Sequence, residues 1–245
     1  MRPHPPRDPK TNPSTGMNVD RLLKKGDLVF DIGAHNGEYT EQYLSLGCRV
    51  IAVEPQLNEL QGLMERFSGR NLPVTIVPFA ISNTFKEMEL HICETASSLS
   101  TFNERRINEG RFSPATPYEP YGVYRWTRIE YIECKTIDWL IEKYGKPAFC
   151  KIDVEGHELQ AVQGLTQVLP LLSFEYEIEF IDLVPPIAAH LLSVGNYEFN
   201  HCVDLWPDLA LEQWGSIDTV ISDIHMRAKR DFADMWGDIY ARPKS

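Results

Sequence analysis

The segment DLVFDIGAHNG, residues 27–37, has the pattern of a buried strand that runs directly into a glycine-containing turn. Residues 27–31 are predicted to form the strand, and residues 38–46 are predicted to form a helix that ends before Gly47. A second apolar stretch, residues 49–54, ends in a glutamate. Strand, turn, helix and second strand in this order indicate a βαβ unit at the start of an α/β domain.

The same alternation of apolar runs and amphipathic stretches continues along the chain, without an internal repeat. Further strands are predicted at residues 74–79, 148–153, 171–180, 197–200 and 219–224, with shorter ones at 88–93 and 129–134. Helices are predicted at residues 58–67, from Thr136 onward, at 158–168 and at 187–192, and an amphipathic tail is expected at the end. The predicted fold class is α/β, with a doubly wound, mostly parallel sheet.

The 245 residues, of which 43% are hydrophobic, suffice for one globular domain around one core. This single domain is expected to span residues 17–245, after a flexible proline-rich tail at residues 1–16. Residues 95–128 interrupt the alternation with an aromatic-rich insertion that contains Phe102, Phe112, Tyr118, Tyr121, Tyr124 and Trp126. A lid or substrate loop is the favoured interpretation, and a merely structural insertion is the alternative.

Charge and composition limit the partners of the chain. The formal net charge of -11 opposes binding to nucleic acid, so no nucleic-acid partner is expected. The five cysteines form no CxxC pair and indicate neither a disulfide framework nor a zinc ribbon, which fits a cytoplasmic location. No stretch reaches the roughly 18 apolar residues of a membrane span. The sequence leaves open whether the chain forms a homo-oligomer.

The glycine spacing in the first turn distinguishes between two kinds of ligand. Gly33 and Gly37 allow a bound molecule to approach the backbone closely. A dinucleotide fingerprint that starts at Gly33 would need glycines at positions 35 and 38, which hold His35 and Glu38. Asp31 and Glu38 would repel a pyrophosphate, but they suit the ammonium and sulfonium groups of S-adenosylmethionine. The turn therefore favours this cofactor over the alternative, an NAD(P)-dependent oxidoreductase.

Glu54 supplies a second acidic position, 23 residues after Asp31. At this spacing a βαβ unit places a carboxylate where it accepts hydrogen bonds from both ribose hydroxyls of a nucleoside. The alternative is a purely structural turn, in which Asp31 only caps the following helix.

A second motif, KIDVEGHE at residues 151–158, ends a buried strand at the edge where open α/β sheets bind ligands. So many charges are costly there unless they are used or paired. His157 is the first candidate for a general base, because an imidazole pKa of about 6.5 suits proton transfer near neutrality. Asp153 or Glu155 would orient it or act in its place. The alternatives are a His157 bonded to backbone and a Glu158 that acts only as a charge at a helix start.

Two further acidic patterns bear on the same edge. Asp153, Glu155 and His157 have the chemistry of divalent metal ligands, but three positions within five residues at a strand end need not converge, and no metal is predicted. Glu175, Glu177 and Glu179 alternate along the predicted strand and share one face. One or two of them are expected to reach the acceptor site, with a polar sheet end as the alternative.

With these motifs in order, the sequence resembles the FkbM family of S-adenosylmethionine-dependent methyltransferases. The similarity lies in DIGAHNGEYT at residues 31–40, VIAVEP at 50–55, VPFAISN at 77–83 and KIDVEGHELQAVQG at 151–164, with TIDWL at 136–140 before the fourth strand. It covers roughly residues 26–180. The family more often has asparagine at the position of His35.

The resemblance implies a class I methyltransferase fold with a seven-stranded sheet, and it assigns roles along the cofactor. Asp31, Gly33 and Gly37 would line the methionine end, Glu54 would bind the ribose, residues 80–82 would border the adenine, and Asp153 would lie near the sulfonium and the acceptor. The full expected set of cofactor-binding residues is Asp31, Gly33, Ala34, His35, Asn36, Gly37, Tyr39, Thr40, Glu54, Pro55, Ala80, Ile81, Ser82 and Asp153.

Family members typically methylate hydroxyl groups of sugars, polyketides or related metabolites, so the resemblance implies O-methylation of a small-molecule or glycosylated acceptor. The aromatic side chains of the insertion suit this class of acceptor, because their faces stack on sugar rings. The alternative from another functional class is a non-catalytic Rossmann-like interaction module that keeps the fold without the chemistry.

Overall fold

The computed structural model describes residues 22–114, 124–203, 208–230 and 235–244. The predicted tail at residues 1–16 and two aromatic residues of the insertion, Tyr118 and Tyr121, lie outside these ranges.

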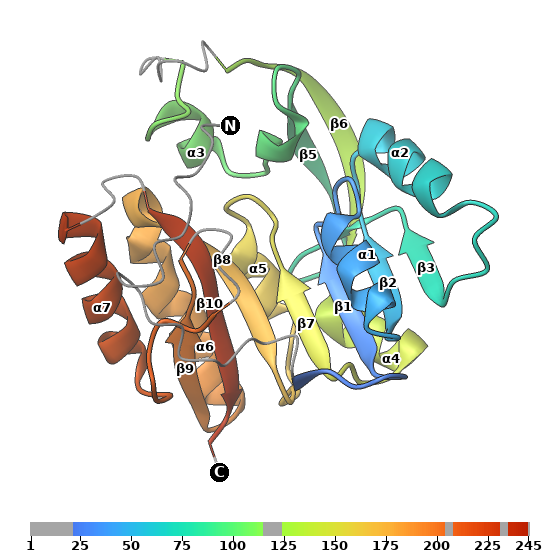
Figure 1. The fold of residues 1–245 in the computed structure, drawn as a ribbon. Helices are drawn as coiled ribbons and strands as arrows, with labels where there is room; N and C mark the ends of the chain where they lie inside the picture. Colours follow the sequence, from blue (N-terminus) through green and yellow to red (C-terminus); the bar gives the residue numbers. More distant parts are fainter. Residues whose placement is uncertain (1–21, 115–123, 204–207, 231–234, 245) are drawn as a thin grey trace.

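A seven-stranded sheet in the order β3-β2-β1-β7-β8-β10-β9 forms the centre of the molecule (Figure 1). Its strands are β1 (Leu28–Ile32), β2 (Arg49–Val53), β3 (Val74–Val77), β7 (Phe149–Ile152), β8 (Leu172–Glu177), β9 (Tyr197–His201) and β10 (Trp236–Pro243). All neighbouring pairs are parallel except the two that involve β10. The prediction of a doubly wound, mostly parallel seven-stranded sheet is confirmed.

Helices cover both faces of this sheet and bury its apolar side chains. They are α1 (Glu38–Ser45), α2 (Leu57–Phe67), α4 (Ile137–Tyr144), α5 (Glu158–Gln163), α6 (Val184–Val194) and α7 (Ile217–Arg230). Tyr43 of α1 packs with Val29 of β1, while α4 to α7 pack against the opposite face, where Phe30 and Phe174 are fully buried. None of the helices in the described ranges is long and apolar enough to cross a bilayer.

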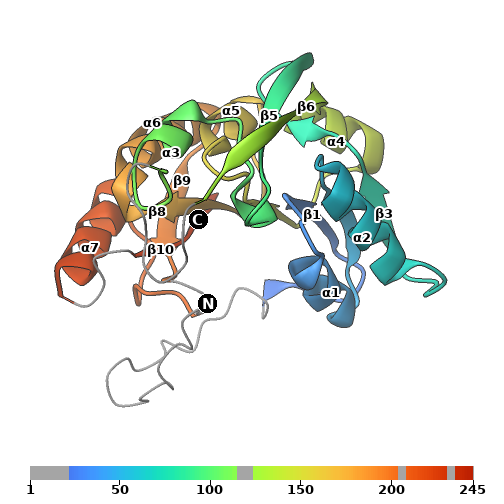
Figure 2. The ribbon, with the colours of Figure 1, turned by 90° about the horizontal axis from the view of Figure 1, so that it is seen from above.

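The insertion and its neighbours form a second layer at the carboxyl ends of the parallel strands. β4 (Ala80–Ile81), β5 (Lys86–Cys93) and β6 (Trp126–Lys135) make a separate three-stranded sheet, in the order β4-β6-β5. Between β5 and β6 lie the short helices η2 (Ser97–Leu99) and α3 (Glu104–Asn108). Figures 1 and 2 show β5, β6 and α3 above the main sheet, so that this layer covers the edge where its strands end.

The last part of the chain corrects two predictions. Residues 219–224 were predicted as a strand because they are rich in β-branched side chains, but they belong to α7. Val220 and Ile224 are its buried residues, one helical turn apart, so tertiary packing overrides the local preference. The expected amphipathic tail contains β10, which pairs with β8 and β9. Its partners lie far away in sequence, and no local pattern shows them.

Two predicted elements are shorter than expected. The strand predicted at residues 171–180 ends at Glu177, and the chain continues as the 3₁₀ segment η3 (Ile178–Leu183). The helix predicted at 158–168 ends at Gln163, where Gly164 follows. Element boundaries depend on local turns that apolar periodicity does not resolve.

Candidate functional site

The turn after β1 is held against two neighbouring strands. The backbone N–H groups of Gly33 and Ala34 both donate to the carbonyl of Val53, at 2.9 Å. Gly33 has a φ of +86°, and a Cβ atom there would lie 1.7 Å from the carbonyl oxygen of Asp153. Only glycine fits this position, because any side chain would separate the turn from the end of β7. This close approach brings the two sequence motifs together.

Asp31 and Thr40 form the support under the turn. Both are almost completely buried, and the Thr40 hydroxyl donates to the Asp31 carboxylate at 2.5 Å. Burial raises the pKa of Asp31, and the positive charge of Lys151 opposes this rise. Neither Asp31 nor Thr40 lines the adjoining cavity. They therefore contribute by holding the first turn of α1 against the end of β1.

Glu54, at the end of β2, is fixed by two backbone hydrogen bonds. One carboxylate oxygen accepts from the N–H of Gln56 and the other from the N–H of His35, each at 2.8 Å. Burial raises the pKa of Glu54 to about 7, although both hydrogen bonds favour the ionised form. Each oxygen keeps a second lone pair, and Glu54 lines the cavity. Glu54 is thus held in one orientation with the capacity to accept two hydroxyl donors.

A cavity of about 310 Å³ lies between the first turn, the end of β2, β4 and the insertion. The predicted residues that line it are Gly33, Ala34, His35, Asn36, Tyr39, Glu54, Pro55, Ala80, Ile81, Asp153 and Glu155. Those that the structure places outside its lining are Asp31, Gly37, Thr40, Ser82 and His157. Phe102 of the predicted lid or substrate loop also lines the cavity, and lining residues that were not singled out from the sequence include Gln56, Leu90, Ser97, Ser98 and Ser100.

The insertion supplies one wall of the cavity, through residues whose individual contacts the sequence did not indicate. The hydroxyl of Ser97 lies 3.2 Å from Nε2 of His35, and the hydroxyl of Ser100 donates to the side chain of Gln56 at 2.5 Å. Thr101 donates to the carbonyl oxygen of Glu155 at 2.6 Å. The composition of residues 95–128 suggested a lid, but these contacts join positions 44–62 residues apart and have no local signature.

Three carboxylates gather beside the cavity and are called the acidic cluster below: Asp153, Glu155 and Glu175. One oxygen of each lies within 4.8 Å of the others. The ammonium group of Lys151 donates to Asp153 at 2.6 Å, and the guanidinium group of Arg106 pairs with Glu155. Lys151 is itself buried. Asp153 and Glu155 therefore each lie against a positive group, although Arg106 is shared with Glu177.

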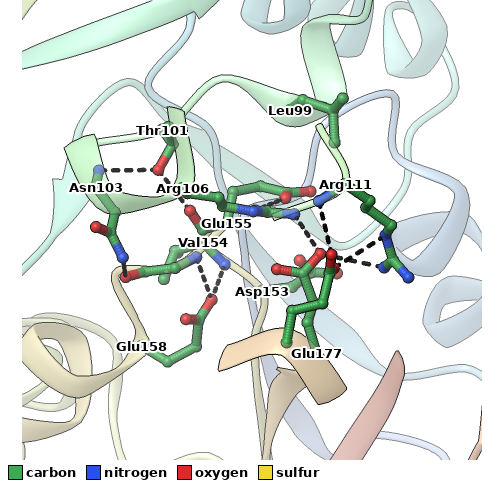
Figure 3. A network of polar contacts seen from close by, with 12 residues as sticks. Leu99, Thr101, Asn103, Arg106, Arg111, Asp153, Val154, Glu155, Glu158 and Glu177 are labelled. Carbon is green, nitrogen blue, oxygen red and sulfur yellow. Dashed lines mark hydrogen bonds and ion pairs between the residues drawn. The ribbon is translucent and has the colours of Figure 1, made fainter. Parts of the chain in front are cut away.

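Arginines from the insertion tie it to the acidic strand end (Figure 3). Arg106 is 3% exposed and pairs with Glu155 and with Glu177, the latter at 2.9 Å. Arg111 lies 3.3 Å from both Glu177 and Glu179. The expectation that one or two of the strand glutamates reach the acceptor site therefore does not apply to Glu177 and Glu179, which anchor the insertion.

The acidic cluster has the geometry for one metal ion, since its three oxygens are close enough to coordinate together. Lys151 and Arg106, however, already compensate the charges of Asp153 and Glu155. A metal ion is not needed to hold these carboxylates together. His157, the third ligand that the sequence suggested, does not belong to the group.

His157 lies behind the cavity wall at the start of α5. Its side chain is buried, its Nε2 atom lies 3.0 Å from the Ser82 hydroxyl, and its ring packs beside Phe102. Burial lowers the pKa of His157 to about 4. Its backbone carbonyl accepts the N–H of Ala161, as at a helix N-cap. His157 is therefore the N-cap residue of α5, as in the alternative from the sequence, but its ring contacts the side chains of Ser82 and Phe102 and does not bond to backbone.

The matching family profile and the matching relative are both described as methyltransferases. The sequence profile of the methyltransferase FkbM domain matches residues 31–192. The hexuronic acid methyltransferase AglP of Haloferax volcanii is 26% identical over 166 residues, which are 64% of this chain and 59% of that protein. The aligned region thus spans less than two thirds of that relative.

Similar solved structures include two methyltransferases. The precorrin-6y C5,15-methyltransferase of Geobacter metallireducens has a TM-score of 0.46 and 12% identity, with 92% of this chain and 84% of that chain covered. A putative rRNA methylase of Clostridium thermocellum has a TM-score of 0.44 and 12% identity, with 93% of each chain covered.

Proposed function

The chain belongs to the FkbM methyltransferase family, and from this membership we propose that it transfers a methyl group from S-adenosylmethionine to a hydroxyl group of a sugar-containing acceptor. Its sheet, with a single reversed strand between β8 and β9, is that of the class I methyltransferases. Family membership leaves no support for the oxidoreductase alternative.

The observation that carries the cofactor proposal is the position of Glu54. Its carboxylate faces the cavity with both oxygens oriented by backbone donors, which suits the two neighbouring hydroxyls of a ribose. Ala80, Ile81 and Leu90 give the same cavity an apolar wall that suits a flat base. Asp153 lies at the end of β7, two strands away from Glu54, where its charge would attract an ammonium or sulfonium group.

Methyl transfer requires the protein mainly to align the cofactor and the acceptor. When bound, S-adenosylmethionine supplies a methyl group on a positively charged sulfur, ready for displacement. The chain must fix both reactants, exclude water and accept the proton of the acceptor hydroxyl. Ser97 and Ser100 line the cavity and bond to His35 and Gln56, and in this proposal they help to exclude water.

A sugar hydroxyl is the acceptor that fits the acidic cluster best. Asp153, Glu155 and Glu175 offer carboxylate oxygens that accept hydrogen bonds from the hydroxyl groups of a sugar. The relative from Haloferax volcanii is described as acting on a hexuronic acid, which supports a carbohydrate acceptor. All five cysteines are free and buried, and we propose a cytoplasmic location on that basis.

Calorimetric titration of S-adenosylhomocysteine tests the cofactor site. Wild type and Glu142→Ala, a matched change on the exposed face of α4, are expected to bind with equal, micromolar affinity. Glu54→Ala is expected to bind at least tenfold more weakly, because two hydrogen bonds to a charged group are lost. Absence of binding to a folded wild type would refute the proposal and favour the non-catalytic interaction module.

A further inference from the structure

Glu175 lies one strand beyond Asp153 at the same edge of the sheet. The register pairs Lys151 with Ser173 and Ile152 with Phe174, so that the next residues along, Asp153 and Glu175, are neighbours. The order β2-β1-β7-β8 therefore places Glu54, Gly33, Asp153 and Glu175 in a row across the strand ends. If the ribose lies at Glu54, the reacting end of the cofactor points along this row toward Glu175.

Glu175 differs from the other members of the acidic cluster in its contacts. Lys151 pairs with Asp153 and Arg106 pairs with Glu155. The side chain of Glu175 makes no hydrogen bond or ion pair with any other residue in the described ranges. Its side chain is intermediate in exposure, and its carboxylate lies next to that of Asp153, which lines the cavity, whereas Glu175 itself does not line it. Glu175 is thus the carboxylate of the cluster whose lone pairs are free for an acceptor hydroxyl.

The surroundings of Glu175 favour its protonated form. The charged groups around it come from five elements or loops: Asp153 and Glu155 after β7, Glu158 of α5, Glu177 of β8, Asp238 of β10 and Arg106 of α3. Burial raises the pKa of Glu175 well above its ordinary value, and the negative charges of Asp153, Glu177 and Glu158 add to this effect. Arg106 opposes it. In its ionised form, a carboxylate with a raised pKa is a stronger proton acceptor than an ordinary one.

We propose that Glu175 is the general base of the methyl transfer and takes the proton of the acceptor hydroxyl. This inference rests on the proposed function. In the transfer, the O–H bond of the acceptor and the S–CH₃ bond of the donor break while a C–O bond forms. The electron pair of the S–CH₃ bond stays on sulfur, and the proton moves to a carboxylate oxygen of Glu175.

The other candidates suit this role less well. His157 is buried behind the cavity wall, bonded to Ser82, and its pKa is lowered to about 4. Asp153 and Glu155 are held by Lys151 and Arg106. Asp153 is a positioning residue for the cofactor in this arrangement, while Glu155 helps to anchor the insertion.

The first test measures the ionisation of Glu175 and needs no acceptor. Protein labelled with ¹³C at the glutamate carboxyls is titrated by NMR in complex with S-adenosylhomocysteine, and the signal absent from Glu175→Gln identifies the residue. A pKa clearly above the ordinary value of about 4.3 is expected. A pKa at or below that value would overturn the proposal, whichever acceptor the enzyme uses.

The second test measures turnover with p-nitrophenyl β-D-glucuronide and p-nitrophenyl β-D-glucoside as probes. Glu175→Gln is expected to lower kcat at least 100-fold on a probe that the wild type methylates, with unchanged affinity for S-adenosylhomocysteine. Glu142→Gln is the control and should match the wild type. A Glu175→Gln rate within threefold of the wild-type rate would overturn the role of Glu175 and leave the proposed function intact. If the wild type does not bind the cofactor, the proposed function itself is overturned.

The kcat of the wild type should also rise with pH around the pKa that NMR gives for Glu175. This rising part of the pH–rate profile, its acid limb, should be absent in Glu175→Gln. A limb that stays in the variant would assign the proton to another group and refute the proposal. If the wild type methylates neither probe, the NMR titration decides.

Discussion

Replacing Arg106 tests whether the insertion is held to the sheet by buried charge. The guanidinium group of Arg106 is 4% exposed and contacts Glu177, which is 7% exposed, and Glu155, which is 21% exposed. Removing one partner of a buried ion pair costs about 3–5 kcal/mol, because the other charge stays buried without its partner. When Arg106 is replaced, solvent still reaches the partly exposed Glu155, and Glu177 still pairs with Arg111. Arg106→Met should therefore cost about 3 kcal/mol, near the lower end of that range.

Arg105, on the same short helix, provides a matched control. It pairs with Glu109 and Asp182, but its side chain is 38% exposed, and exposed pairs contribute about 0–1 kcal/mol. Urea unfolding followed by circular dichroism should show a small loss of stability for Arg105→Met and a large one for Arg106→Met. The double variant Arg106→Met/Glu177→Gln should recover part of the loss, because it also removes a buried charge.

Equal losses for the two single variants would refute this reasoning and show that the buried pairs do not anchor the insertion. Hydrogen exchange adds a local readout. The backbone amides of residues 97–108 should lose protection in Arg106→Met and keep it in Arg105→Met.

Two further predictions follow from shifted pKa values. The pKa of Glu54 is about 7 in the free protein, and the hydroxyl donors of a bound ribose favour its ionised form. The affinity for S-adenosylhomocysteine should therefore rise between pH 6 and 8. Calorimetry should show that this rise is absent in Glu54→Gln. The pKa of His157 is about 4 in the folded state and about 6.5 in the unfolded state. Burial of the neutral ring therefore stabilises the fold above pH 6.5. This contribution to the free energy of unfolding is lost as the pH falls toward 4. Thermal unfolding of His157→Gln should depend less on pH in this window than that of the wild type, and equal slopes would contradict the assignment.

Local motifs were enough to predict where Gly33 and Glu54 lie in the fold. Gly33 and Glu54 are recognisable because a strand, a turn and a parallel strand in sequence fix the positions of both residues. His157 shows the limit of such reasoning. Its place after a strand suggested a base, but whether an imidazole faces a cavity or packs under a wall depends on Ser82 and Phe102, which lie 55 or more residues away.

The sequence by itself determined the order of the βα units, the glycine turn and the acidic residue that follows β2, because periodicity and spacing within one βαβ unit fix them. Only the tertiary structure decided that β10 enters the sheet between β8 and β9 and that Ser97 and Ser100 line the cavity. It also decided that Lys151 and Arg106 pair with Asp153 and Glu155, while the side chain of Glu175 has no such partner among the described residues. These features depend on contacts between segments far apart in the chain, and the free energy of such contacts leaves no periodic pattern in the sequence.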